Sequence, residues 1–154
     1  MANTYTQILY HIVFSTKDRA PCIAKSRRDD LYAYIWGIHK ELKCHLYRIG
    51  GVEDHVHILT HIHPTIALSS YMEKLKSGAT NWIRRERIFE QWPGWQDGFG
   101  AFTLSNKEKG TVVKYIMGQE EHHRTVAFID EYKQLLTEAG IEYEEPRLLK
   151  EFRR

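Results

Sequence analysis

Two histidines separated by one residue stand in an apolar stretch of the chain, HVHILTH at 55–61. The Val, Ile and Thr content of this stretch predicts a strand, and side chains two apart on a strand point to the same face. His55 and His57 would then lie about 7 Å apart on one face, close enough to bind a single metal ion. An isolated pair of this type is more often a pair of surface or core histidines, so the spacing alone leaves both interpretations open.

A second pair of chemically capable residues lies near the C-terminal end of the sequence. Tyr115 and Gln119 are four residues apart in a predicted helix, which places a phenol hydroxyl and an amide on one helix face. A hydroxyl is a potential nucleophile and an amide oxygen is a potential metal ligand. Taken alone, such a pair more often serves packing.

The predicted elements that position these two pairs alternate between strands and helices. Strands are expected at 4–16, 45–49, 55–61 and 99–104, and helices at 26–44, 65–87, 106–123 and 128–139. Gly50 and Gly51 are expected to turn the chain between the second and third strands. The order β-α-β-β-α-β is typical of an α+β fold, the ferredoxin-like split βαβ arrangement. This fold has a four-stranded antiparallel sheet with two helices on one face, followed here by a helix that bears the tyrosine and by a tail helix.

In this topology the first and third strands are neighbours in the middle of the sheet. The predicted strand with His55 and His57 is the third, so both histidines should stand on a central strand. The position matters because a central strand is held on both edges and gives its side chains a fixed direction.

Composition sets broad limits on the class of protein. The 154 residues are 42% hydrophobic and 27% charged, typical of one globular domain. Cys22 and Cys44 form neither a disulfide framework nor a CxxC motif, and no run reaches the length of a membrane span. Residues 1–115 hold 16 Lys and Arg against 11 Asp and Glu, a balance of +5, whereas 116–154 hold 6 against 9, a balance of −3. A basic body with an acidic tail weakly favours a polyanionic partner.

Five stretches of the sequence, taken together, resemble one family of enzymes. They are YHIVFSTKDR at 10–19, EDHVHIL at 53–59, ALSSYMEKLKS at 67–77, WQDGFGAF at 95–102 and VVKYIMGQEEHH at 112–123. The chain resembles the HUH single-tyrosine transposases of bacterial insertion sequences, of the 200/605 type, and their REP-associated relatives. The specific feature is the combination of a His-x-His strand with a later Tyr-x-x-x-Gln helix.

The resemblance implies a role for each residue of the two pairs. His55, His57 and Gln119 match the metal ligands, with Mg²⁺ or Mn²⁺ as the ion, and Tyr115 matches the nucleophile. It implies a transposase that cuts and rejoins single-stranded DNA with hairpin ends through a 5′-phosphotyrosine. It also implies a homodimer with active sites shared between subunits, no membrane association, and a cytoplasmic location in a bacterium or archaeon. The catalytic domain would span 1–125, with a helical tail at 126–154.

Further residues are candidates for supporting roles. His11, on the first strand, and His122, on the face of the tyrosine helix, are expected as neighbours of the metal ligands. Basic residues are expected to contact DNA phosphates, although a solvated face is the ordinary explanation for each one. These residues are Lys17, Arg19, Lys74, Lys76, Arg84, Arg85 and Lys114.

Other functions are compatible with parts of the pattern. A non-catalytic ferredoxin-like module that binds nucleic acid, or a domesticated REP-type relative, would share the fold, but a binding module has no use for a hydroxyl beside a metal site. A replication initiator or relaxase-like nickase usually has further domains. A zinc-stabilised protein using His55, His57 and His122 would unfold on chelation, whereas a catalytic metal site would lose only activity.

Overall fold

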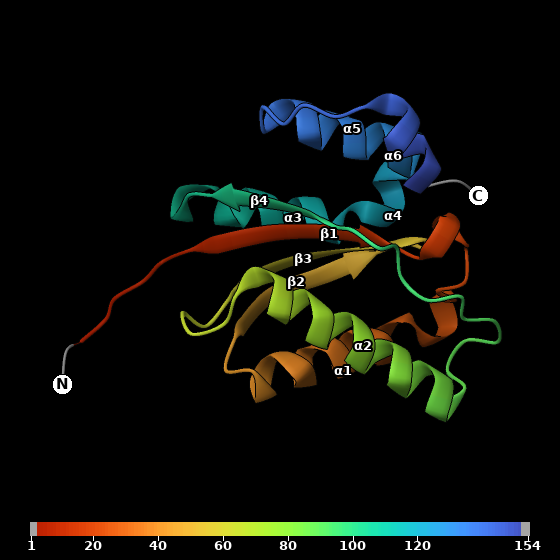
Figure 1. The fold of residues 1–154 in the computed structure, drawn as a ribbon, viewed down its shortest axis with the longest axis horizontal. Helices are drawn as coiled ribbons and strands as arrows, with labels where there is room; N and C mark the ends of the chain where they lie inside the picture. Colours follow the sequence, from red (N-terminus) through yellow and green to blue (C-terminus); the bar gives the residue numbers. More distant parts are fainter. Residues whose placement is uncertain (1–2, 152–154) are drawn as a thin grey trace.

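The computed structural model describes residues 3–151, and the chain runs through four strands and a series of helices (Figure 1). The strands are β1 (Leu9–Ser15), β2 (His45–Gly51), β3 (His55–His61) and β4 (Gly100–Leu104). The α-helices are α1 (Lys25–Glu41), α2 (Leu68–Glu86), α3 (Lys109–Met117), α4 (Gln119–His122), α5 (Phe128–Glu138) and α6 (Glu145–Glu151). Two short 3₁₀ helices, η1 (Lys17–Arg19) and η2 (Asn106–Glu108), follow β1 and β4.

The four strands form one antiparallel sheet in the order β2-β3-β1-β4. The predicted split βαβ fold is confirmed, including the central position of β1 and β3. The register pairs Val13 with His57 and Ser15 with His55. The two histidines are therefore held on a strand with hydrogen-bonded neighbours along both edges.

Helices α1 and α2 cover one face of the sheet, while α3, α4 and α5 lie over the other (Figure 1). The main core lies under α1 and α2, where alternate strand residues such as Ile12, Phe14, Val56 and Ile58 are fully buried. The alternation follows from the two-residue period of a strand, which sends the residues between them to the opposite face. On that opposite face, Val13 packs under α5.

The turn expected at Gly50 and Gly51 is not there. Both glycines belong to β2, where they pair with His57 and Val56, and the chain turns after them at 52–54. Gly50 is needed for a different reason: a Cβ atom at this position would lie 2.7 Å from the carbonyl oxygen of Ile116 in α3. The missing side chain lets the helix that carries Tyr115 lie directly against the strand.

The single helix expected at 106–123 is interrupted. A 3₁₀ turn with a capping box between Ser105 and Glu108 starts it, α3 ends at Met117, and α4 begins at Gln119 after a non-helical Gly118. The break falls between Tyr115 and Gln119, so the two residues belong to different helices. The predicted tail at 126–154 contains α5 and α6, and its last three residues lie outside the described residues.

Candidate active site

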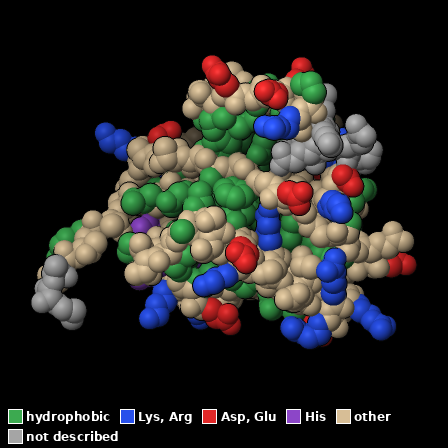
Figure 2. Space-filling view, in the orientation of Figure 1, with side chains coloured by type: hydrophobic (Ala, Val, Ile, Leu, Met, Phe, Trp, Pro, Cys, Tyr) green, Lys and Arg blue, Asp and Glu red, His purple; other side chains and the backbone are tan. Residues whose placement is uncertain are grey.

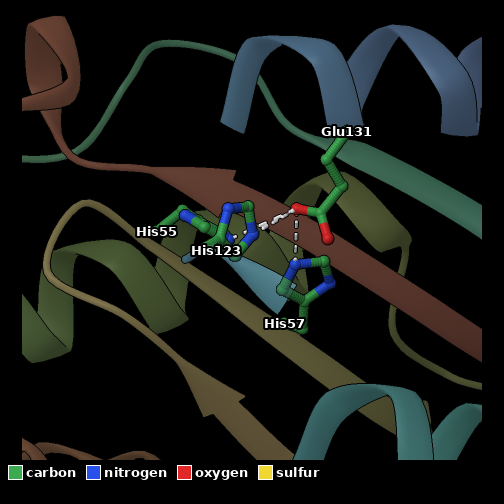
Figure 3. Close-up of side chains that lie close together, drawn as sticks. All are labelled: His55, His57, His123 and Glu131. Atoms are coloured by element: carbon green, nitrogen blue, oxygen red, sulfur yellow. Dashed lines mark hydrogen bonds and ion pairs between the residues drawn. The ribbon is translucent and has the colours of Figure 1, made fainter. Parts of the chain in front are cut away.

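A cluster of three histidines, two of them fully buried, and one buried glutamate lies between the sheet and α5 (Figure 3). His55 and His57 project from β3, His123 comes from the segment after α4, and Glu131 points down from α5. One nitrogen or oxygen from each of the four residues lies within 4.8 Å of the others. Ligands about 2.1 Å from a common ion lie about 3 to 4.2 Å apart. The distances of 3.1 to 3.3 Å from Glu131 Oε1 to the three histidine Nε2 atoms fall within this range.

The three imidazoles are oriented in the same way. In each, Nδ1 makes a hydrogen bond away from the cluster while Nε2 lies within 3.3 Å of Glu131 Oε1. The Nδ1 partners are Asp54 Oδ1 at 2.8 Å for His55, His11 Nε2 at 2.9 Å for His57 and the Val126 carbonyl oxygen at 2.6 Å for His123. Metal-binding histidines characteristically donate their second ring N–H in this way, which frees the other nitrogen for the ion. The donor set therefore fits a divalent cation.

Tyr115 and Gln119 reach the same cluster from the side of α3 and α4. Gln119 is buried, its Oε1 lies 3.0 Å from His55 Nε2, and its Nε2 donates to Glu131 Oε2 at 3.0 Å. The Tyr115 hydroxyl donates to the same Oε2 atom. The ring of Tyr115 lies 5.6 Å from the ring of His57. Both residues of the second pair thus lie beside the histidine pair of their own chain.

Burial and hydrogen bonding shift the pKa values of the cluster in opposite directions. Burial lowers the pKa of His57 to about 4 and that of His11 to about 3. Burial also opposes charge on His55, yet hydrogen bonds to Asp54 and Glu131 raise its pKa to about 9. Burial and the Glu131 hydrogen bond raise the pKa of Tyr115. The surroundings thus favour the charged form of His55 and the neutral form of His57.

The carboxyl group of Glu131 is the electrostatic centre of this arrangement. Burial alone favours its neutral form, but hydrogen bonds from His123, His55 and His57 outweigh burial and hold its pKa well below the usual range. A buried carboxylate of this type needs several donors or a cation around it.

Three residues of the cluster were missed by the sequence analysis: Glu131, His123 and Asp54. Glu131 carries a usable signal, because it shares a helix face with Phe128, Tyr132 and Leu135, and a charged residue on an apolar stripe needs a buried partner. The only sequence signal of Asp54 is its position directly before the His-x-His strand. His123 shows no distinguishing pattern, because it follows another histidine at the end of a helix.

The predicted supporting histidines lie near the cluster. His11 contacts His57 through the 2.9 Å hydrogen bond, and its ring stacks on that of His57 at 5.1 Å. The Nε2 atom of His122 lies 3.3 Å from Glu131 Oε2, and the rings of His122 and Tyr115 are 5.6 Å apart. Both are placed where they can influence the ligands; their roles stay predictions.

The predicted DNA-contacting residues are divided between two sides of the molecule. Lys114 is adjacent to Tyr115, and Lys17 and Arg19 follow the end of β1 that pairs with His55. Most Lys and Arg side chains on the face in Figure 2 lie over α1 and α2 instead. Lys76 bonds to the carbonyl oxygens of Gln96 and Gly98, both at 2.7 Å. The remaining three of the predicted set, Lys74, Arg84 and Arg85, lie on α2, across the sheet from the cluster.

A cavity of about 400 Å³ opens beside the tyrosine. It lies between β4, α3 and α5, and its lining includes His11, Phe102, Tyr115, Glu131 and Leu135. The volume is within the range of small-ligand sites, and the wall combines apolar surface with the hydroxyl and the carboxylate. A substrate group that enters here meets the Tyr115 side chain.

Comparison with known proteins identifies the family. The model of the family described as "Transposase IS200 like" matches residues 4–119, three quarters of the chain and all of both residue pairs. The chain belongs to this transposase family. The family resemblance inferred from the motifs is thus confirmed. No curated protein sequence matches the chain.

Two solved structures have a similar fold. A candidate transposase from Deinococcus radiodurans R1 superposes with a TM-score of 0.60 at 21% identity, covering 77% of this chain and 96% of that one. A REP-associated tyrosine transposase bound to a REP hairpin also gives a TM-score of 0.60, at 15% identity, covering 82% of this chain and 76% of that one. At these identities the likeness supports the fold.

Among residues 3–151, no helix has both the length and the apolar character needed to cross a membrane.

Proposed function

We propose that this IS200-like transposase is a metal-dependent single-stranded DNA endonuclease and strand transferase. The observation that carries the proposal is the position of Tyr115, whose hydroxyl reaches the His55–His57 cluster of the same chain through Glu131. A ferredoxin-like module that only binds nucleic acid has no need for a hydroxyl held at a buried set of metal ligands.

The proposed metal ligands are His55, His57 and Gln119, with Mg²⁺ or Mn²⁺ as the ion. Two contacts support this set: His55 Nε2 lies 3.0 Å from Gln119 Oε1, and the Nε2 atoms of His55 and His57 both face Glu131 Oε1. When bound, a divalent cation would draw charge from the scissile phosphate and stabilise the transition state. Asp54 and His11 would fix the orientation of the two imidazoles through their Nδ1 hydrogen bonds.

Tyr115 is the proposed nucleophile. Its phenolic oxygen bonds to phosphorus while the bond from phosphorus to the 3′ oxygen breaks, giving a 5′-phosphotyrosine and a free 3′-hydroxyl. The proton lost by the phenol is balanced by the proton gained at the leaving oxygen. Rejoining is the reverse reaction with the 3′-hydroxyl of another strand, because the phosphotyrosine ester conserves the bond.

The proposed substrate is single-stranded DNA with hairpin ends. The similar REP-associated transposase was solved with a hairpin bound, which supports the same class of partner here. Lys114, Lys17 and Arg19 are the predicted phosphate contacts nearest to the cluster. The role of the basic residues on α2 would then be limited to DNA that extends around the molecule.

Trapping a covalent protein–DNA adduct tests this function. Protein is mixed with Mn²⁺ or Mg²⁺ and with 3′-labelled single-stranded DNA carrying the palindromes that flank its gene, then resolved on a denaturing gel. A metal-dependent covalent band that disappears in Tyr115→Phe is expected. Tyr34→Phe is the matched control, because Tyr34 stacks on Trp82 on the α1–α2 side of the sheet. DNA retardation without a covalent band, with both flanking palindromes, would favour a binding module or an inactive relative.

The homodimer with shared sites stays a prediction, and subunit mixing tests it. Tyr115→Phe retains the histidine cluster and His57→Ala retains the nucleophile, so each is inactive for a different reason. If the tyrosine helix acts on the partner subunit, a mixture of the two variants regains part of the activity. If each chain uses its own tyrosine, the mixture stays inactive while light scattering still reports the oligomeric state.

A further inference from the structure

We propose that Glu131 is an active-site residue shared by the metal ion and the nucleophile, with Oε1 as a metal ligand and Oε2 as the group that positions the Tyr115 hydroxyl. The proposal rests on the proposed function and extends its site in two ways. It adds a carboxylate to the metal ligands, together with His123. It also makes α5, which lies in the predicted tail, a working part of the active site.

The first carboxylate oxygen lies where a ligand belongs. Oε1 is 3.1 Å from the Nε2 atoms of both His57 and His123 and 3.3 Å from that of His55. All three Nδ1 atoms are engaged elsewhere, so the three Nε2 atoms are the ring nitrogens that face Oε1. A cation bound here would take the place of the protons that these nitrogens share with the carboxylate, and the same four atoms would be its ligands.

The chemistry of the donor set supports the same conclusion. Mg²⁺ and Mn²⁺ favour oxygen ligands, and a carboxylate is the strongest of these in proteins. Two imidazoles and an amide supply no negative charge, whereas Glu131 supplies one at the same point. A ligand set that includes the carboxylate is therefore better matched to the divalent ions of the proposed reaction.

The second carboxylate oxygen faces the nucleophile. Oε2 accepts the hydrogen bond of the Tyr115 hydroxyl and a hydrogen bond from Gln119 Nε2 at 3.0 Å. The two oxygens of one carboxylate thus contact the histidine nitrogens on one side and the hydroxyl of the proposed nucleophile on the other. This contact would hold the phenol close to an ion bound by Oε1.

Packing fixes Glu131 in this place. Phe128, one helical turn earlier, stacks on the ring of His55 with centroids 4.3 Å apart. Phe128, Tyr132 and Leu136 are all buried in a cluster with Val13 of the sheet. The apolar face of α5 therefore presents the carboxylate to the cluster from a helix, which positions a side chain more accurately than a loop does.

Two other roles for Glu131 make opposite predictions. A carboxylate that only balances protonated histidines would stabilise the ion-free fold and leave metal affinity unaffected by its loss. A carboxylate that occupies the ion's own position would compete with the metal, so that its removal would tighten binding. Of these three roles, only the ligand role predicts that the affinity of the protein for the ion falls when the charge of Glu131 is removed.

The decisive variant is Glu131→Gln, measured by calorimetry with Mn²⁺ on the full chain. Asp130→Asn is the matched control, since Asp130 is the neighbouring carboxylate of α5 on its exposed side. For Glu131→Gln we expect Mn²⁺ affinity to fall about 10-fold or more, because an uncharged amide replaces the proposed carboxylate ligand. For Asp130→Asn we expect wild-type affinity.

The nucleophile half of the proposal is tested separately, at saturating Mn²⁺. Glu131→Gln should then still form the covalent adduct about 10-fold or more slowly, because the amide no longer offers a charged acceptor to Tyr115. Tyr115→Phe should bind Mn²⁺ as the wild type does. This combination separates loss of the ligand from loss of the positioned hydroxyl.

Unchanged or tighter Mn²⁺ binding by Glu131→Gln would overturn the proposal. If this variant does not fold, Glu131→Asp decides the question, because it keeps the negative charge on a side chain that is one methylene shorter. Wild-type Mn²⁺ affinity together with a wild-type adduct rate in Glu131→Asp would also overturn the proposal. Wild-type protein that forms no adduct overturns the proposed function. If the wild type forms the adduct and Glu131→Gln equals it in both adduct rate and Mn²⁺ affinity, only this inference is overturned.

Discussion

The two faces of the sheet are built from the same strands but carry different chemistry. On β3, Val56 and Ile58 point toward α1 and α2, where the surroundings are almost wholly apolar. His55 and His57 are equally buried, yet point toward α3, α4 and α5 into a network of polar partners. Neighbouring residues of β3 therefore point to opposite faces of the sheet. The apolar face toward α1 and α2 is the packing face, and the polar face toward α3, α4 and α5 is the chemical face.

The difference separates the face that stabilises the fold from the face that carries the polar cluster. Apolar burial on the α1–α2 face stabilises the sheet and fixes the direction of each strand. The other face buries imidazoles, an amide and a carboxylate, groups that are costly to bury unless every one has a partner. Such a cluster does not add stability that apolar side chains could not supply, because well-packed apolar residues in the same positions would be at least as stabilising.

The largest expected effect comes from His57→Ala, on the chemical face. The substitution removes one proposed metal ligand and the imidazole beside Tyr115, so we expect adduct formation to fall about 1000-fold or more. The adduct assay, normalised to folded protein by circular dichroism, measures it. Substantial activity in this variant would show that the polar face is not the reaction centre.

Ile58→Ala is the matching change on the packing face, one residue along the same strand. Ile58 is fully buried in the main core, and truncation of such a residue costs about 2–5 kcal/mol. We expect that loss in urea unfolding, together with a near wild-type adduct rate at temperatures where the variant is folded. Loss of activity in the folded variant would mean that the two faces are not separable.

Metal binding should stabilise the protein only through the chemical face. At Mn²⁺ concentrations of about 100 times its Kd, the free energy of unfolding should rise by about 2.7 kcal/mol in the wild type and in Ile58→Ala. His57→Ala should show no such rise at the same concentration. Thermal unfolding with and without Mn²⁺ measures the effect, and equal shifts in all three proteins would place the ion elsewhere.

Gly50→Ala tests the close approach of α3 to the sheet. Its Cβ would lie 2.7 Å from the Ile116 carbonyl oxygen, so α3 must move, at a cost of about 1–3 kcal/mol and with slower adduct formation as Tyr115 is displaced. Gly37→Ala in α1 is the control, because its Cβ meets nothing within 4 Å and Ala favours the helix. If both variants behave alike, the contact does not position the tyrosine.

The smallest effect concerns a polar exception on the packing face. His39 bonds to Tyr71 and to the Ile35 carbonyl oxygen, and burial lowers its pKa. The unfolded chain then binds a proton that the folded chain does not, so stability falls as pH drops below about 6.5, by at most about 1.4 kcal/mol per unit for this group. Urea unfolding at several pH values between 5 and 7 should show that the free energy of unfolding depends less steeply on pH in His39→Gln than in the wild type. An equal dependence on pH in both proteins would contradict this prediction.

The sequence by itself determined the order of the elements and the two residue pairs. The two-residue period of β3 placed His55 and His57 on one face, and the split βαβ order placed their strand in the centre of the sheet. These are local or topological properties, which a pattern of residue types records. The break after Met117 escaped prediction because the residues on either side favour a helix, and the expected turn at Gly50 proved to be a contact with Ile116.

Only the tertiary structure decided how the site is completed. Glu131 is 74 residues from His57 in sequence, and their meeting depends on the packing of α5 over Val13. The orientation of the His57 imidazole on β3 likewise depends on a partner from another strand, His11 on β1. Residue types and spacing describe which groups are available, but convergence on one point in space results from packing between elements that no local pattern encodes.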